Sequence, residues 1–321
     1  MPDSCVVIVN PAAGDGRAGR QWPGLSRRLA AAGCAHSAIH TSCPGEATGL
    51  CRALLHSGRD YVVAAGGDGT LNEVLNGFFD AVENDRPINP EARLGVLPLG
   101  TGSDFGRTFG MHAQDEAIRA LAAGTWRLVD AGRVDLEPPE GRTSRRYFLN
   151  VADLGLGAAT AYRVNRAPKR LGAFAAYLLG AVRTIAAHRP LLVSLQIDGA
   201  APIEEMMGIV VLANSRFFGG GMRVAPHAEP DDGYLDVLWL AGTSRGRLLV
   251  DLLPKLYRGT HLGHPAVRLR RASTIRVTCR DRLLLETDGE QIGAAPATFR
   301  VVPGAIRVVV PATTPAASPL S

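Results

Sequence analysis

Lysine is nearly absent from this chain. Its 35 basic residues include only two lysines, Lys169 and Lys255, and the others are arginines. Neither lysine follows a glycine, whereas a Walker A loop requires the run Gly-Lys-Ser or Gly-Lys-Thr. The sequence therefore excludes a P-loop as the nucleotide-binding element.

Long apolar runs and a cysteine pattern are missing as well. No stretch approaches the roughly 18 uncharged apolar residues that a membrane-spanning helix needs, and Met1-Pro2-Asp3-Ser4 lacks the basic region of a signal peptide. The five cysteines show no metal-ligand spacing, which is typical of thiols in a reducing cytoplasm. A net charge of +5 is too small to indicate nucleic-acid binding, but it suits contact with phosphates or an anionic membrane surface.

The 321 residues predict two domains. Up to about residue 130, predicted strands at 4–9, 36–41, 61–65 and 93–98 alternate with helices at about 17–32, 46–56 and 115–123. This alternation predicts a parallel sheet with right-handed crossovers, and hence a three-layer α/β domain over 1–130.

Short strands dominate the remainder of the chain and predict an antiparallel, β-rich sandwich domain over 131–302. We expect these strands at 146–151, 191–197, 208–213, 235–240, 267–269, 274–278, 283–286 and 298–302. Helices at about 171–188 and 244–257 interrupt them. The segment of about 303–321 is expected to return to the first domain, with a frayed end.

A glycine-rich turn, Gly66-Gly67-Asp68-Gly69-Thr70, links a predicted strand to a helix. Glycine lets backbone N–H groups approach a ligand, and the first N–H groups of a helix form an anion site. Asp68 would repel phosphate unless a divalent cation, a water network or a substrate hydroxyl lies between them. The alternative is that Asp68 only caps the helix.

Three other loops leave strand ends on the same edge of the predicted sheet, at 10–14, 41–45 and 98–104. Parallel sheets of this kind bind ligands beyond the carboxyl ends of their strands. Residues 14–19 match the pattern Gly-x-Gly-x-x-Gly, but the second strand ends in Thr41-Ser42-Cys43, with no acid to hold a ribose. We therefore reject a Rossmann dinucleotide site and keep a phosphate site of another kind.

Four motifs occur in a fixed order: Asn10-Pro11, Gly66–Glu73, Leu97–Phe105 and Thr287-Asp288-Gly289-Glu290. Together, over about residues 4–310, they resemble the bacterial diacylglycerol kinase catalytic family, soluble lipid kinases related to sphingosine and ceramide kinases. The resemblance implies an α/β nucleotide domain, a β-rich lipid domain, a cleft between them, and ATP with Mg²⁺. It also implies a diacylglycerol-like substrate for a cytoplasmic protein at the inner membrane face.

Partners follow from that resemblance. We expect the lipid substrate and anionic phospholipids, contacted by basic stretches at 163–170 and Arg268-Leu269-Arg270-Arg271, although ordinary solvated charge would explain them equally well. A homodimer is a further partner to consider, because sheet edges often pair. Rival functions are a kinase of a soluble substrate such as NAD, and a non-catalytic lipid-binding protein on the same fold.

The resemblance also assigns binding roles. ATP is placed against Asn10, Pro11, Ala12, Ala13, Gly14, Thr41, Gly66, Gly67, Asp68, Gly69, Thr70, Leu71, Asn72, Thr101 and Asp104. Asp68, Asp104 and Asp130 match acids of the family's metal and water network. A second metal would take the Asp232 carboxylate and the backbone carbonyls of Glu229 and Tyr234, although an acidic β-turn is the alternative. Ser103 replaces the family's usual asparagine.

The catalytic assignment is Asp288, Glu290 and Asp68. Asp-Gly is a strong hairpin signal, so a plain hairpin is the alternative. The resemblance implies that an acid of this element activates the acceptor hydroxyl. We assign Asp288 to orient that hydroxyl and take its proton late, and Glu290 to metal or phosphate-bound water. The reverse assignment stays open, and Asp68 is the next candidate base.

Overall fold

The computed structural model describes residues 4–80, 85–100, 103–111, 113–137, 143–156, 158, 189–242 and 251–312. The chain divides into two compact units. Unit 1 comprises Met1–Ala131, Pro230–Asp232 and Val302–Ser321; unit 2 comprises Gly132–Glu229 and Gly233–Val301. The short piece Pro230–Asp232 has no counterpart in the division drawn from the sequence.

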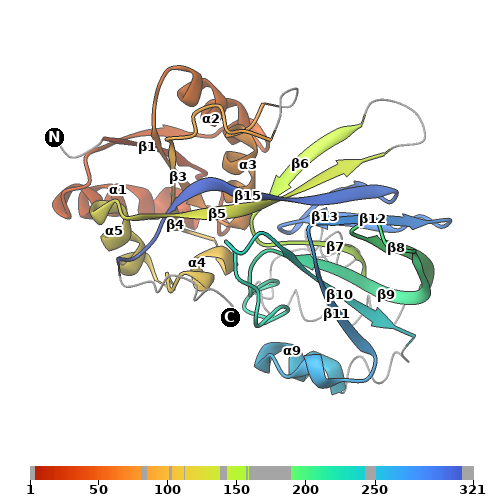
Figure 1. Cartoon of the computed structure of the whole chain (residues 1–321). Helices are drawn as coiled ribbons and strands as arrows, with labels where there is room; N and C mark the ends of the chain where they lie inside the picture. The colour runs from red at the N-terminus through yellow and green to blue at the C-terminus, as the bar shows by residue number, and fades with distance from the viewer. Residues whose placement is uncertain are drawn as a thin grey trace. The chain divides into compact units, whose positions relative to one another are not determined.

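Unit 1 contains a parallel sheet with strands in the order β15-β4-β3-β1-β2 (Figure 1). Its elements are β1 (Cys5–Val9), α1 (Arg17–Ala31), β2 (His36–His40), α2 (Glu46–His56), β3 (Tyr61–Gly66), α3 (Asp68–Gly77), β4 (Arg93–Pro98), α4 (Asp104–Thr108) and α5 (Gln114–Ala123). Every residue of β1 and of β3 is buried, as expected for parallel strands covered on both faces.

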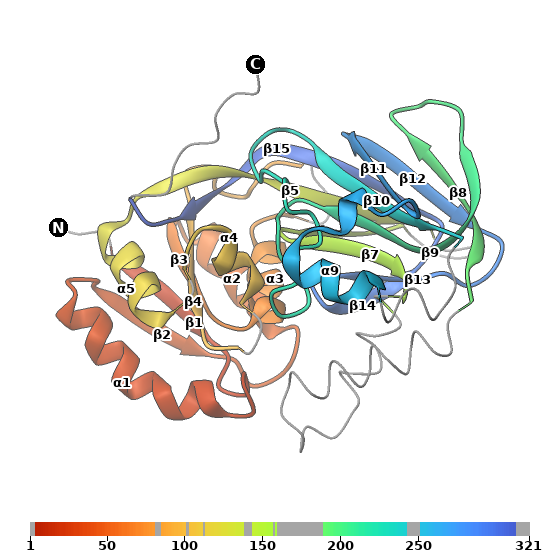
Figure 2. The same ribbon diagram turned by 90° about the horizontal axis from the view of Figure 1, so that it is seen from below.

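The helices of unit 1 form two groups. α2 packs against α3, and α1 contacts α5 (Figure 2). The strand order explains why α1 and the pair α2 and α3 are in different groups, because the chain moves from β1 to β2 in one direction and then from β2 to β3 and β4 in the other. Right-handed crossovers in opposite directions place their helices on opposite faces of the sheet. The carboxyl ends of β1, β2, β3 and β4 consequently share one edge.

Unit 2 is an antiparallel sheet with the order β14-β13-β7-β9-β8-β12-β15, to which β10 and β11 add through β9. Its strands are β6 (Ser144–Phe148), β7 (Val151–Gly155), β8 (Leu191–Ile197), β9 (Ile203–Ala213), β10 (Leu235–Ala241), β11 (Val267–Ala272), β12 (Thr274–Cys279), β13 (Leu284–Thr287) and β14 (Glu290–Ala294). The strands β5 (Trp126–Leu136) and β15 (Ala297–Val309) have residues in both units. A helix α9 (Leu253–Arg258) and a 3-10 turn η3 (His261–Gly263) follow β10.

Several boundaries differ from the sequence-based expectation. The strand predicted at 146–151 is two strands, because the chain bends at Leu149-Asn150 between β6 and β7. β5 and β14 were not predicted; charges such as Arg133 and Asp135 interrupt the apolar pattern of β5, and these two side chains pair with each other. The predicted helix at 171–188 lies outside the described residues, and only α9 of the helix predicted at 244–257 is described.

None of the described helices is both long and apolar enough to cross a bilayer.

Gly132 provides a test of the packing between β5 and β6. It pairs with Phe148, and a Cβ placed on Gly132 would lie 2.0 Å from Cζ of that ring. We predict that Gly132→Ala lowers the free energy of unfolding by about 1–3 kcal/mol, the usual cost of overpacking. Gly49→Ala in α2 is the control, because a Cβ there meets nothing within 4 Å and should stabilise the helix by about 0.5–1 kcal/mol. Urea unfolding measures both, and equal stability of Gly132→Ala and the wild type would contradict the packing described.

Candidate active site

Two glycine-rich turns of unit 1 touch through their backbones. The carbonyl of Gly66, after β3, accepts the N–H groups of Leu99 at 2.7 Å and Gly100 at 3.1 Å, after β4. A Cβ on Gly100 would stand 2.4 Å from the Cα of Gly67, and one on Gly66 would stand 2.4 Å from Oγ1 of Thr70. A side chain at Gly100 would push the two turns apart, and one at Gly66 would collide with the Thr70 side chain of its own turn, so both positions require glycine.

The other two loops are joined to the same edge. Asn10, after β1, donates from Nδ2 to Oγ1 of Thr70 at 2.9 Å and accepts the N–H of Ala12 at 3.0 Å. Glu73 of α3 accepts the N–H of Gly45 at 2.8 Å, in the loop after β2, and that of Ala47 at 3.2 Å, in the first turn of α2. The structure thus brings together the four loops that the sequence predicts at one edge of the sheet.

The other described residues that the sequence analysis assigns to ATP binding lie in the loops after the strands and in the first turns of α3. Thr41 follows β2 and donates its N–H to the carbonyl of Val9 at 2.9 Å. Gly14 has φ +60°, and a Cβ on it would stand 3.1 Å from the Arg17 guanidinium, so Arg17 places a cation beside this loop. Leu71 and Asn72 are buried in the first turns of α3. Thr101 lies outside the described residues.

Asp68 joins the two turns rather than capping its own helix. The residue before α3 is Gly67, and no side chain caps this helix; the Oδ2 of Asp68 instead accepts the N–H of Asp104 at 3.3 Å, at the start of α4. Burial raises the pKa of the Asp68 carboxyl, while the N–H groups of residues 103–105 act in the opposite direction. The alternative that Asp68 only caps the helix that it begins is therefore wrong.

Asp104 and Ser103 continue that second turn. Asp104 is buried, and its Oδ1 lies 3.7 Å from Nε of Arg107. Ser103 has φ +53°, a left-handed conformation that asparagine adopts more readily than serine. This backbone angle is a physical reason for the asparagine that the resemblance leads one to expect at this position.

The first turn of α3 is the part of this sheet edge that can bind an anion. Leading N–H groups of a helix have no acceptor within their own helix and attract anions. Here they follow a backbone that glycine leaves uncovered at Gly66, Gly67 and Gly100. Such an arrangement can bind phosphate oxygens through backbone N–H groups.

Unit 2 contains Asp288, the residue that the sequence analysis assigns as the acid that activates the acceptor. It lies with Gly289 in the two-residue turn between β13 and β14, with φ +50° and +90°, and Thr287 pairs with Glu290 across it. Its Oδ1 accepts the N–H groups of Asn150 at 3.0 Å and Val151 at 3.1 Å, and its Oδ2 accepts that of Leu149 at 3.1 Å. The segment is therefore both a hairpin and a holder of a firmly oriented carboxylate. Glu290 is exposed at the start of β14.

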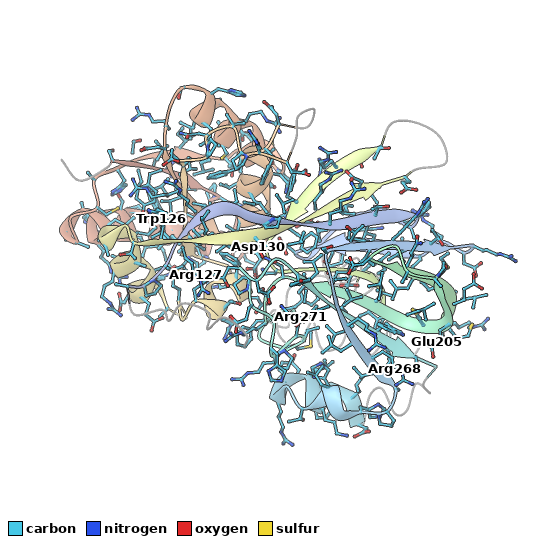
Figure 3. The ribbon with its side chains drawn as sticks, viewed as in Figure 1. Trp126, Arg127, Asp130, Glu205, Arg268 and Arg271 are labelled. Atoms are coloured by element: carbon cyan, nitrogen blue, oxygen red, sulfur yellow. The ribbon has the colours of Figure 1, made fainter. Side chains whose placement is uncertain are left out.

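The unit boundary passes through the segment predicted to bind a second metal. In unit 1, Asp231 pairs with Arg127, the Pro230 carbonyl accepts the N–H of Asp130 at 2.7 Å, and Oδ1 of Asp130 accepts the N–H of Gly304 at 2.7 Å. Arg127 and Asp130 both lie on β5 (Figure 3). In unit 2, Glu229 pairs with Arg216, and Arg271 stacks over the ring of Tyr234 at 4.9 Å.

Within the described part of the chain, no group of three or more His, Cys, Asp or Glu residues is placed to hold a metal ion. The shell predicted from the sequence used one carboxylate, Asp232, with two backbone carbonyls, and Gly233 has φ +78° in that turn.

Sequence reasoning missed one pair of acids near Asp288. Asp153 of β7 and Glu286 of β13 are opposite each other in the sheet, and both are fully buried. A signal was present, since each acid stands in an otherwise apolar strand, in Val-Ala-Asp-Leu and Leu-Leu-Leu-Glu. An acid at such a position needs a hydrogen bond, a cation or a proton.

Both domains of the chain match known protein families. Residues 4–134 match the diacylglycerol kinase catalytic domain, and residues 150–310 match the YegS C-terminal NAD kinase beta sandwich-like domain. The chain is thus a kinase with an α/β N-terminal domain and a β sandwich-like C-terminal domain. It belongs to the diacylglycerol kinase catalytic family, a family of lipid kinases, which confirms the resemblance.

The relatives cover nearly the whole chain. A diacylglycerol kinase of Bacillus subtilis (strain 168) is 29% identical over 308 residues, covering 95% of each chain. One of Staphylococcus aureus (strain bovine RF122 / ET3-1) is 31% identical over 297 residues, covering 91% of this chain and 88% of that one. A solved structure from Bacillus anthracis str. Sterne, provisionally assigned as a diacylglycerol kinase, is similar with a TM-score of 0.74 at 26% identity, covering 96% and 97%.

The backbone contact between the two glycine-rich turns predicts how a methyl group added at Gly100 changes the affinity for ATP. In Gly100→Ala the new Cβ would lie 2.4 Å from the Cα of Gly67, so the turns must separate and misplace the N–H groups. We predict that affinity for a non-hydrolysable ATP analogue falls roughly 10- to 100-fold, equivalent to one charge-assisted hydrogen bond of 1.5–3 kcal/mol. Titration calorimetry measures it, with Gly49→Ala as the control and thermal unfolding to show that both variants fold. Unchanged affinity would remove these turns from the phosphate site.

Proposed function

We propose that this protein transfers the γ-phosphoryl group of ATP to the hydroxyl of a diacylglycerol-like lipid at the inner surface of the membrane. The observation that carries the proposal is the carboxylate of Asp288, held by three backbone N–H groups in the motif that the resemblance assigns to acceptor activation. Membership of a kinase family implies ATP as the donor, and relatives named diacylglycerol kinase support the acceptor class.

On the donor side, backbone N–H groups of Gly67 to Thr70 would bind phosphate oxygens. Asp68 keeps the two turns in register through the N–H of Asp104. Bound Mg²⁺ would add positive charge beside the phosphates, and hard oxygen donors fit that ion. We assign Asp130 to its water network, and Asp232 with the backbone carbonyls of Glu229 and Tyr234 to a second metal, while Asp231 is taken by Arg127.

On the acceptor side, phosphoryl transfer passes through a loose transition state, so catalysis is mainly positioning and charge neutralisation. Asp288 would orient the lipid hydroxyl and accept its proton as the bond to phosphorus forms. Its three N–H partners fix the direction of its carboxylate in advance. Glu290, exposed at the start of β14, would contact metal-bound or phosphate-bound water.

A product assay tests this function. The protein is incubated with labelled ATP and vesicles containing diacylglycerol, ceramide or sphingosine, or with soluble NAD, and products are separated by thin-layer chromatography. A labelled diacylglycerol product supports the proposal. Phosphorylation of NAD with none of any lipid would make it a kinase of a soluble substrate, and no transfer to any acceptor would make it a non-catalytic relative.

Asp288→Asn removes the group that accepts the proton but keeps the shape of the side chain. Asp288→Asn should lower kcat by roughly 10²–10⁴-fold, the span of a positioned acid–base group, while KM for ATP barely changes. Its new NH₂ group cannot accept the N–H of Leu149, so a stability loss of about 1–3 kcal/mol is also expected, and kcat is measured well below the unfolding temperature. Glu290→Gln is run beside it. Normal turnover in both variants would show that the motif is only a hairpin.

Strand β11 supports contact with an anionic membrane. It pairs only with β10 among the described strands, and four of its residues, Arg268, Leu269, Arg270 and Arg271, are exposed. Arg268 and Arg271 are seen on this strand in Figure 3. Arg271 lies near Asp236 and stacks on Tyr234. We propose that this basic edge contacts anionic lipid headgroups. The other basic stretch, at 163–170, lies outside the described residues.

Charge reversal on β11 tests the membrane contact. Each basic residue near an anionic surface contributes roughly 1 kcal/mol within a Debye length of about 8 Å. Arg268→Glu with Arg270→Glu should therefore weaken binding to anionic vesicles by at least about 10-fold. Arg27→Glu with Arg59→Glu, two exposed arginines of unit 1, is the matched control of equal charge. Vesicle co-sedimentation measures the loss, and equal weakening by both double variants, or salt-independent binding to neutral vesicles, would contradict it.

A further inference from the structure

The buried acids Asp153 and Glu286 form a cross-strand pair in unit 2. They are direct partners between β7 and β13, and neither has any exposed surface. Directly opposite residues of an antiparallel pair bring their Cβ atoms to about 4.5–5.5 Å on the same face of the sheet. The two carboxyl groups therefore face each other in a place that water does not reach.

Only one of the four carboxyl oxygens of this pair has a hydrogen bond of good geometry. Oδ1 of Asp153 accepts the N–H of Ala158 at 2.6 Å. Oδ2 of Asp153 and both carboxyl oxygens of Glu286 are buried, and none of them makes a hydrogen bond of good geometry to the described residues. Two ionised carboxylates cannot donate to each other and repel at this range. One proton held between them creates an O–H···O hydrogen bond and removes one of the two charges.

The surroundings favour that proton. Burial raises the pKa of Asp153, and burial, Asp153 and Asp288 together raise the pKa of Glu286 well above its ordinary value of 4.5. The N–H of Gly289 acts in the opposite direction on Glu286. The neighbours on the adjacent strands, Val211 of β9 and Gln291 of β14, carry no charge.

The same two strands hold Asp288. Asp288 follows Glu286 by two residues and donates its N–H to the carbonyl of Val151 at 2.9 Å. Its carboxylate accepts the N–H groups of residues 149–151, which lead into β7, two residues before Asp153. Any separation of β7 from β13 at the acid pair would therefore disturb the contacts that orient Asp288.

We propose that Asp153 and Glu286 share one buried proton, and that this pair is a positioning element for Asp288. Losing the proton would place a second full negative charge beside the Asp288 hairpin and push β13 away from β7. The part that concerns turnover rests on the function proposed above; the shared proton and the positioning do not.

Stability against pH tests the shared proton without any assay of activity. A carboxyl whose pKa is raised in the folded state stabilises the protein at low pH, and this contribution is lost as pH rises from about 4.5 through the raised value. The wild type should therefore lose stability over that interval. Glu286→Gln replaces the proton with an amide donor to Asp153, so its stability should be flatter with pH. Glu204→Gln, exposed on β9, is the matched control and should follow the wild type.

A second readout follows the proton and the positioning directly. Infrared difference spectra should show a protonated carboxyl in the wild type at neutral pH that Glu286→Gln lacks. Hydrogen-exchange protection of the Leu149, Asn150 and Val151 amides should fall by roughly tenfold as the wild type loses the proton, the equivalent of one pKa unit of coupling. In Glu286→Gln this protection should be independent of pH. Asp153→Asn provides the reciprocal variant should Glu286→Gln fail to fold.

Kinetics completes the test. At high pH the wild-type kcat should fall with the protection of the 149–151 amides at constant KM for ATP, and Glu286→Gln should keep its kcat. If the stability of Glu286→Gln depends on pH in the same way as that of the wild type, the proposal of a shared proton would be overturned. If the stability of Glu286→Gln does not vary with pH, but its amide protection and its kcat vary with pH as they do in the wild type, the positioning role would be overturned. Absence of lipid phosphorylation in the wild type would overturn only the proposed function, since unfolding, infrared and exchange data would stand.

Discussion

The contact between the Gly66 carbonyl and the N–H groups of Leu99 and Gly100 is the constraint on which the first unit depends. It requires two backbones to meet where any Cβ would collide. Because the turns after β3 and β4 are held together, the start of α3 faces the edge that carries the loops after β1 and β2. A phosphate site of backbone N–H groups needs this order, since such groups cannot reorient as a side chain can.

Carboxylates also hold together segments that are far apart in the sequence. Asp68 accepts an N–H at the start of α4, and Asp288 accepts three from the bend before β7. Bonds from N–H groups to an ionised acceptor are stronger than neutral ones, so one side chain can fix a whole turn. The carboxylate itself becomes oriented in return, which is the property that positional catalysis requires. Under the proposed function, the structural and the chemical role would therefore coincide in the same residues.

The protein stabilises its buried acids in three ways. Asp288 is bonded to backbone N–H groups. Asp135 is desolvated by burial, but Arg133 and Arg145 outweigh that effect and lower its pKa. Among the described residues no cation acts on Asp153 or Glu286, and in our proposal this pair holds a proton instead. These solutions differ in their response to pH, because only the last one depends on a proton that can leave.

The sequence by itself determined the local features: alternating strands and helices, glycine-rich turns, and a hairpin at Asp288-Gly289. These follow from periodicity and from the backbone angles that neighbouring residues allow. Only the tertiary structure decided that Asp68 bonds α4 rather than its own helix, that Pro230–Asp232 belongs to the first unit, and that Glu286 faces Asp153 across β13 and β7. Those outcomes depend on strand register and on contacts between residues far apart in the chain, which no local pattern specifies.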